Sequence, residues 1–109
     1  MAGYTFKQML FFYARNKKST TRRPLRNVRD ALVRMNGAVN YYVWGNKIAT
    51  LLPRKRILTV SSAGWETKLT KDRLNRLLPK GYITQKKFKW YYVVNNRTIP
   101  FRGSLRIKL

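Results

Sequence analysis

The 109-residue sequence contains no cysteine and no histidine. Without cysteine the chain cannot form a disulfide bond or offer a thiolate nucleophile. Without histidine it lacks the side chain that most often moves protons near neutral pH and most often binds metals. These two absences exclude thiol and imidazole metal sites and every catalytic arrangement that depends on cysteine or histidine.

Acidic residues are also scarce: the chain has only Asp30, Glu66 and Asp72. Carboxylates that catalyse hydrolysis or hold a metal ion act in close groups, and these three are far apart in the sequence. The chain also lacks the G-x-x-x-x-G-K-[ST] loop that binds nucleotide phosphates. We therefore expect a protein that is not an enzyme and that carries no metal and no cofactor.

Long apolar runs are missing as well. No stretch approaches the roughly 20 apolar residues of a transmembrane helix, so we expect no membrane span. The opening MAGYTFKQMLFFYARNKK has its apolar residues before its charges, whereas a secretory signal begins with the charges. Its aromatic residues also argue against an organelle transit peptide.

Basic residues dominate what is present. The chain has 25 Lys+Arg against 3 Asp+Glu and a formal net charge of +22, with a pI near 11.4. Solubility rarely needs more than about 8 net charges on a small domain, so this charge indicates a polyanionic partner. Nucleic acid is the first candidate, because each neutralised phosphate releases a counterion. An anionic membrane and an acidic protein surface are the others.

The N-terminal segment divides into a helix and a basic stretch. Thr5 and Gln8 form the pattern of a capping box, and apolar residues follow at helical spacing, so we predict a helix over 6–15. The stripe favours core packing over a membrane-surface role, which usually needs a longer helix. Residues 16–26, NKKSTTRRPLR, are either a solvated loop or an arm that lies along phosphates. We expect residues 1–26 to form a helix and basic arm, and 27–109 a single α+β domain.

Residues 28–35 allow two interpretations. Asn27 can cap a helix there, and Asn36-Gly37 can end it. This helix is our prediction. The apolar residues in the same stretch also alternate, which would suit a strand.

From residue 39 the hydrophobic period changes to two, which is typical of strands. A glycine-containing pair can join the first two strands as a tight turn, because such turns need positive φ. We predict a three-strand meander made of 39–44, a Gly45-Asn46 turn, 47–52, a Pro53-Arg54-Lys55 turn and 56–61.

The stretch GWETKLTKDRLNRLL (64–78) predicts a helix over 71–78. Thr70 is the expected N-cap, and Asp72 falls in the first turn, where the helix dipole favours a carboxylate. Leu69 can pack on Leu74 as a hydrophobic staple. Trp65, before the helix, is expected to anchor it on the sheet.

The same helix has two predicted faces. Three leucines, Leu74, Leu77 and Leu78, form the expected buried stripe. The outer face carries residue types that suit major-groove reading, where arginine pairs with guanine and asparagine with adenine. A solvated polar face is the alternative. The expected outer residues are Asp72, Arg73, Asn75 and Arg76.

A second hairpin follows the helix. Strands 82–85 and 88–94 are predicted on either side of a Lys86-Lys87 turn. Phe88, Trp90 and Tyr92 alternate onto one face, which favours core packing; exposed rings beside lysines would instead suit base stacking. The remaining predictions are a turn at Asn95-Asn96 and an alternating strand at 104–109.

Together these elements predict an α+β fold: a small antiparallel sheet made of a three-strand meander, a central helix and a further hairpin, preceded by helical N-terminal elements. The expected nucleic-acid contacts are the basic residues of the arm, the turns and the hairpin, with the polar outer face of the helix. They are Lys17, Lys18, Arg22, Arg23, Arg26, Arg54, Lys55, Lys68, Arg73, Asn75, Arg76, Lys86, Lys87 and Lys89.

Three stretches carry a resemblance: GNKIA (45–49), SSAGWETKLTKDRLNRLL (61–78) and ITQKKFKWYY (83–92). In combination they resemble a group of small proteins of tailed bacteriophages, over roughly residues 40–103. That group has threonine where this chain has Leu69, and it has late acidic residues that this chain lacks. The resemblance implies phage origin and a shared fold, and it implies no function.

Three functions share this charge. The first is a phage nucleic-acid-binding protein that grips phosphate, with duplex DNA preferred over RNA. The second is a host-takeover inhibitor that binds an acidic host enzyme such as a polymerase, a nuclease or a defence complex. The third is a virion component that touches packaged DNA. The first two would act in the cytoplasm of the infected host, and the third in the particle.

Overall fold

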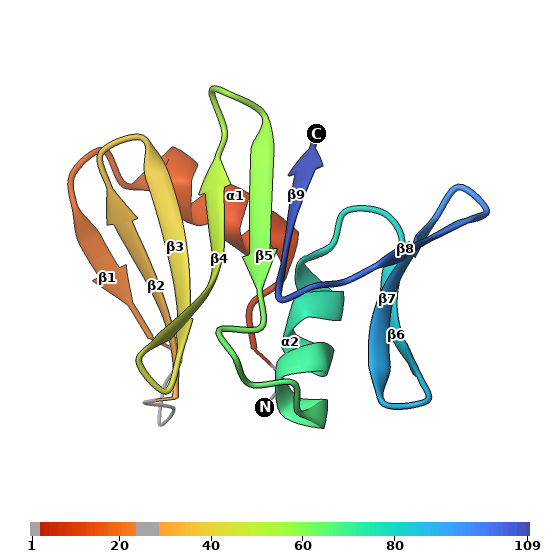
Figure 1. The fold of residues 1–109 in the computed structure, drawn as a ribbon. Coiled ribbons are helices and arrows are strands. Elements are labelled where there is room, and N and C mark those ends of the chain that lie inside the picture. Colours follow the sequence, from red (N-terminus) through yellow and green to blue (C-terminus); the bar gives the residue numbers. More distant parts are fainter. Residues whose placement is uncertain (1–2, 24–28) are drawn as a thin grey trace.

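The computed structural model describes residues 3–23 and 29–109. This part of the chain forms two helices and nine strands in two antiparallel sheets, as Figure 1 shows. The predicted α+β class is confirmed. The elements in chain order are α1 (Phe6–Arg15), β1 (Thr20–Arg22), β2 (Asp30–Met35), β3 (Ala38–Val43), β4 (Asn46–Leu52), β5 (Ile57–Ser61), α2 (Lys68–Leu77), β6 (Tyr82–Lys86), β7 (Lys89–Val94), β8 (Arg97–Pro100) and β9 (Ser104–Lys108).

The larger sheet has six strands in the order β1-β2-β3-β4-β5-β9. The predicted meander forms its centre, and strands from both ends of the described chain extend it. The last strand returns to pair with β5, from Ile57 opposite Lys108 to Ser61 opposite Ser104. Short turns join β2, β3, β4 and β5 in sequence, whereas β9 is added to the sheet by pairing with a segment distant in the chain.

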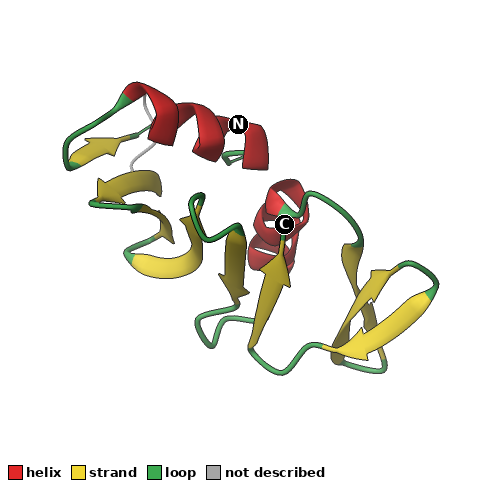
Figure 2. Cartoon of the chain, turned by 90° about the horizontal axis from the view of Figure 1, so that it is seen from above, coloured by secondary structure: helices red, strands yellow, loops and turns green. Residues whose placement is uncertain are grey.

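The smaller sheet, β6-β7-β8, stands beside the larger one, and α2 lies between them (Figure 1). The helix contacts both β4 and β6, while α1 contacts β2 and β3. Seen from above in Figure 2, the two helices lie on the same side of the six-stranded sheet. One hydrophobic core therefore connects both helices and both sheets.

Both helices and both sheets contribute side chains to the hydrophobic core. Met9 and Phe12 point inward from α1, and Leu74 and Leu77 from α2; each is at most 3% exposed. The large sheet supplies Tyr41, which is fully buried. The predicted stripe of three leucines on α2 is confirmed, since all three are buried.

The first helix agrees with the prediction in both bounds and cap. The side chain of Thr5 accepts a hydrogen bond from the backbone N–H of Gln8, and the Gln8 side chain accepts one from Thr5. Asn16 ends the helix by donating to the carbonyl of Phe12. These signals are local, so the sequence alone predicts them reliably.

The second helix begins three residues earlier than predicted. Its N-cap is Thr67, whose hydroxyl accepts the backbone N–H of Thr70 at 3.3 Å, so the prediction of Thr70 as cap is wrong. Thr70 instead lies buried, with its hydroxyl 3.2 Å from that of Thr67. Asp72 consequently falls outside the first turn, which contains no acidic residue. The earlier start places one more helical turn against the core.

The predicted helix over 28–35 is wrong, and the alternating pattern was the correct signal. The segment forms β2, which is hydrogen-bonded on one side to β1 and on the other to β3. Asn36, with φ of 54°, and Gly37 form the hairpin turn into β3 rather than a helix end. Sheet pairing on both sides outweighs the local helix signal. The proposed cap, Asn27, lies outside the described residues.

Part of the predicted arm is a strand. Thr20–Arg22 pairs with β2, with Thr20 opposite Arg34 and Arg22 opposite Leu32. This segment is thus an edge of the large sheet and not a free loop. The predicted domain boundary between residues 26 and 27 lies outside the described residues.

Two hairpin turns are shifted by one residue from the predicted positions. Val43 pairs with Asn46 and Lys86 with Lys89, so the turn residues are Trp44-Gly45 and Lys87-Phe88. The predicted Asn95-Asn96 turn is confirmed, with Val94 opposite Arg97. All six turn residues have positive φ, and this puts Trp44 and Phe88 in a conformation unusual for bulky side chains.

Candidate nucleic-acid interface

The acidic residues are few on the surface, because one of the three is fully buried. Asp30 has no exposed surface, while Glu66 and Asp72 are exposed. Among the described residues, Arg73 is the only basic side chain that is buried; every other lysine and arginine there is exposed or half-buried. The buried pair takes one charge of each sign from the surface, so the surface carries the whole excess of positive charge.

Asp30 and Arg73 form the buried ion pair. Arg73 Nε donates to Oδ1 of Asp30 at 3.2 Å, and the two side chains are 6% and 0% exposed. The expectation that Arg73 lies on the outer face of the helix is wrong. A helix that is capped by Thr67 and packs its leucines inward also turns position 73 toward β2. Burial of this arginine requires a partner carboxylate, and β2 supplies it.

Two tyrosines also contribute to the surroundings of this pair, and Arg29 Nε lies 4.0 Å from Oδ2 of Asp30. The Tyr41 hydroxyl donates to Asp30 Oδ1 at 3.2 Å and accepts the backbone N–H of Tyr4 at 2.9 Å. Burial raises the pKa of Tyr41 far above its ordinary value, and the nearby Asp30 carboxylate acts in the same direction. A Cβ on Gly3 would lie 1.8 Å from the Tyr41 hydroxyl. The extended segment before α1, with Gly3 and Tyr4, therefore closes over a network that holds the fold together.

Asn75 also has a structural role. Its side-chain amide donates to the carbonyl of Ile83 at 3.1 Å and its carbonyl accepts the N–H of Ile83 at 2.6 Å. This bidentate contact joins α2 to β6 and occupies the groups that would read a base. Of the three predicted reading residues, Arg76 alone is exposed and engaged in no described hydrogen bond. The helix therefore offers one basic residue at these positions rather than a reading surface.

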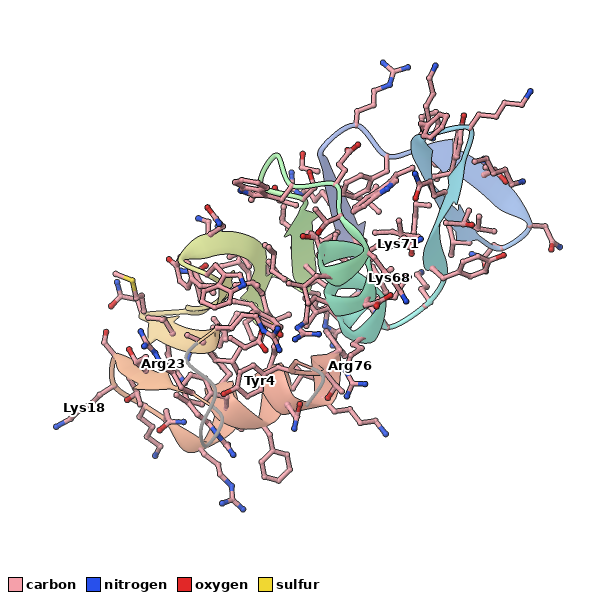
Figure 3. The ribbon with its side chains drawn as sticks, turned by 90° about the horizontal axis from the view of Figure 1, so that it is seen from below. Tyr4, Lys18, Arg23, Lys68, Lys71 and Arg76 are labelled. Atoms are coloured by element: carbon pink, nitrogen blue, oxygen red, sulfur yellow. The ribbon has the colours of Figure 1, made fainter. Side chains whose placement is uncertain are left out.

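The remaining predicted contacts are exposed, and they belong to four places along the chain. Lys17, Lys18, Arg22 and Arg23 belong to the β1 edge; Arg26 lies outside the described residues. Figure 3 shows Lys18 and Arg23 at one end of the molecule, and Lys68, Lys71 and Arg76 on α2 away from them. The predicted nucleic-acid contacts therefore do not form one continuous surface on a single element. The four places are the β1 edge, the turn with Arg54 and Lys55, α2 with Lys68 and Arg76, and the β6–β7 hairpin with Lys86, Lys87 and Lys89.

One grouping that joins two of these places escaped the sequence reasoning. Lys17, Arg34 and Arg54 line a shared hollow of about 250 Å³ beside Tyr13. Arg34 stacks on the Tyr13 ring at 3.8 Å and donates to the Tyr13 backbone carbonyl. The end of α1 therefore meets the turn after β4 and forms a basic concavity. No spacing in the sequence indicates it, because its parts come from three distant segments.

Exposed aromatic residues are the second feature that the sequence did not predict. Phe88, assigned to a core face, is 93% exposed, and Trp65, expected to anchor α2, is 59% exposed. Trp90 and Tyr92, from the same predicted face as Phe88, are buried as expected. The one-residue shift of the turn explains the difference, since it moves Phe88 from the strand to the tip of the hairpin.

Trp65 and Trp44 line one apolar cleft of about 400 Å³ between the β3–β4 turn and the start of α2. Trp44 is 64% exposed. Phe88 lines a different hollow, of about 440 Å³, together with Lys89, Tyr91 and Arg102. Rings and cations are therefore adjacent at the β6–β7 hairpin, whereas the tryptophan cleft is mainly apolar.

Within residues 3–23 and 29–109 there is no group of three or more acidic residues that could hold a metal ion. In the same part of the chain, neither helix has the length and hydropathy needed to cross a bilayer. The arrangement offers cations and rings at its surface, which suit binding rather than acid–base chemistry.

Comparison with known families gives one result. The sequence profile of the Kyanoviridae Gp96 protein family matches residues 8–108. The chain belongs to this family. The Kyanoviridae Gp96 family is a phage family, so the phage origin implied by the resemblance is confirmed. The match begins at residue 8 and includes residues 8–15 of the N-terminal helix, which the resemblance left out. Searches of curated proteins and of solved structures found no match.

Proposed function

We propose that this phage protein binds nucleic acid, chiefly by gripping the phosphate backbone, and prefers duplex DNA to RNA. The supporting observation is the composition of its surface: the described part exposes the side-chain carboxylates of Glu66 and Asp72, whereas every lysine and arginine there except Arg73 is exposed or half-buried. The positive charges of such a surface repel one another and attract a polyanion. Each phosphate that they neutralise releases a counterion. The separated basic regions suit a long, uniformly charged partner better than a small one.

The proposal assigns no reaction to the protein. The buried carboxylate of Asp30 already contacts Arg73 and Tyr41, and the two others are solvated and single. An exposed carboxylate without a partner group is a poor general acid or base. Binding is therefore the complete proposed activity, in the host cytoplasm during infection or in the particle.

Fluorescence anisotropy with a labelled duplex across a salt series tests the proposal. We expect tight binding at low salt and a log–log dependence whose slope counts the phosphates neutralised. The double variant Arg22→Ala, Arg23→Ala should weaken binding to every duplex and flatten that slope without changing sequence preference. Absence of binding at low salt, or a flat salt dependence, would contradict the proposal.

An acidic host protein could use the same surface, so a pull-down from host lysate is run with and without nuclease. Loss of the captured material after nuclease treatment supports nucleic-acid binding. Retention of one host protein after the treatment, with no duplex binding by the purified chain, would assign the basic surface to a host enzyme instead.

A further inference from the structure

The tip of the β6–β7 hairpin is not explained by turn chemistry. Lys87 and Phe88 occupy the turn with φ of 50° and 66°. Tight turns of this kind favour asparagine and glycine, because bulky side chains resist positive φ. The next hairpin of the same sheet uses Asn95-Asn96. Phe88 therefore occupies a position where a smaller polar residue would serve the fold better.

Phe88 is not explained by packing either. Its side chain is 93% exposed, the highest exposure among the exposed large apolar residues of the described chain. Two positions along, Trp90 is 3% exposed and its ring lies 5.7 Å from that of Phe101. Tyr92 is also buried, and its hydroxyl donates to the Lys80 carbonyl at 2.8 Å. The base of the hairpin is thus fixed in the core while its tip presents an unpacked ring.

The charges around this ring repel one another. Lys86, Lys87 and Lys89 are all exposed, and Lys86 lies directly opposite Lys89 in the β6–β7 register. Like charges in directly opposite positions destabilise a hairpin. The hollow beside Phe88 adds Arg102, with Glu66 as its one carboxylate. A partner with closely spaced negative charges would relieve the repulsion.

From these observations we propose that Phe88 is a wedge that inserts between stacked base pairs of duplex DNA while Lys86, Lys87 and Lys89 hold the flanking phosphates. Apolar side chains at the ends of basic elements open and kink base steps in this way. A duplex offers what these side chains need: the apolar faces of its bases can contact the ring, and the phosphates of its two strands can contact the lysines. The hairpin runs beside α2, on the side of the helix away from the large sheet (Figure 1), and the Phe88 side chain at its turn is 93% exposed, so a duplex can reach it. This inference rests on the proposed binding of nucleic acid.

The test uses a short duplex with 2-aminopurine at a TA step, which is easily unstacked, and dyes at both ends to report bending. The intact protein should raise the 2-aminopurine fluorescence and bring the ends closer. Phe88→Ala should abolish both signals and lower affinity about tenfold, since a stacked ring contributes on this order. It should leave the salt slope unchanged, because phenylalanine carries no charge. Phe88→Leu, which keeps an apolar wedge, should retain part of both signals.

Two control variants separate the wedge from general effects. Phe11→Ala removes a phenylalanine that is 61% exposed on α1, and it should change neither signal. Replacement of Lys86, Lys87 and Lys89 by alanine should flatten the salt slope by about 0.9 for each lysine that contacts a phosphate. Thermal unfolding of each variant checks that the fold is intact.

Each contrary outcome has a defined meaning. If the intact protein binds duplex in a salt-dependent way but the 2-aminopurine signal stays constant, the wedge is wrong while the proposed function stands. If the protein does not bind duplex at all, both fail. Binding to phosphatidylserine vesicles that Phe88→Ala abolishes, with duplex binding unaffected, would overturn the wedge and assign the tip to a membrane surface.

Discussion

Arg73 on α2 and Asp30 on β2 form an ion pair in which Nε of Arg73 lies 3.2 Å from Oδ1 of Asp30, and both residues are buried. The pair joins positions 43 apart in the sequence. It attaches the helix between the two sheets to the second strand of the large sheet. It also explains why so basic a chain retains an aspartate at position 30: the buried arginine needs a carboxylate.

The first prediction concerns this pair. Arg73→Met should destabilise the protein by about 3–5 kcal/mol, because it leaves the Asp30 carboxylate buried beside an apolar side chain. The matched control is Arg76→Met, three residues further along α2, where the side chain is exposed. This substitution should change the free energy of unfolding by no more than about 0.5 kcal/mol. Chemical denaturation measures both. Asp30→Asn combined with Arg73→Met should cost less than the sum of the single changes, and strict additivity would show that the two side chains do not interact.

The second prediction concerns alkaline pH. Burial raises the pKa of Tyr41, and the Asp30 carboxylate adds to the rise while the hydrogen bond from the Tyr4 N–H opposes it. An unfolded tyrosine ionises near pH 10, whereas the folded one stays protonated to higher pH. The contribution of Tyr41 is therefore complete below about pH 10 and is lost as the pH rises above it.

Tyr41→Phe isolates that contribution from the titration of the lysines. At neutral pH the variant should be about 1–3 kcal/mol less stable, because it leaves buried hydrogen-bonding groups unpaired. The gap between wild type and variant should be constant from about pH 7 to 9 and narrow above about pH 10. Free energies of unfolding from denaturant titrations give the gap, and a gap that widened with pH would contradict the buried, neutral hydroxyl.

The third prediction distinguishes the two candidate caps of α2. Thr67→Ala should cost about 1 kcal/mol, because the N–H of Thr70 loses its acceptor. Thr67→Ser keeps a hydroxyl and should be nearly neutral. Thermal unfolding of the pair measures the difference. Equal stabilities for the alanine and serine variants would place the start of the helix elsewhere.

The fourth prediction separates two aromatic residues of one hairpin. Trp90→Ala should destabilise the fold by about 3–5 kcal/mol, because Trp90 is 3% exposed. Phe88→Ala should change stability by no more than about 0.5 kcal/mol, because Phe88 is 93% exposed. Denaturant midpoints report both values. A large loss for Phe88→Ala would mean that the ring packs against the chain.

Much of the fold follows from local sequence signals. The capping box at Thr5, the alternating strands and the Asn95-Asn96 turn depend on residues within a few positions of one another, and the structure contains all three. The earlier start of α2 shows the limit of such signals. Thr67 and Thr70 are both able to cap a helix, and the packing of the extra turn against the core selects the first.

The surface, like the fold, is predicted from the sequence only in part. Composition alone predicts that nearly all basic residues are exposed, because a charge without a partner is too costly to bury. Topology decides where they gather, so Lys17 and Arg54 share a hollow although 36 other residues separate them in the printed sequence. The exposure of Phe88 depends on the register of one hairpin, and a shift of one residue reverses the direction of a side chain.

The amino-acid sequence by itself determined the charge, the lack of cysteine and histidine chemistry, the α+β class and the residues able to enter a core. Only the tertiary structure decided that β2 is a strand, that Arg73 is buried, and that Phe88 and the two tryptophans Trp44 and Trp65 are exposed. The physical reason is the range of the interactions. Caps and turns depend on neighbours in the chain, whereas strand pairing, register and the Asp30–Arg73 pair depend on groups that meet only when distant segments fold together.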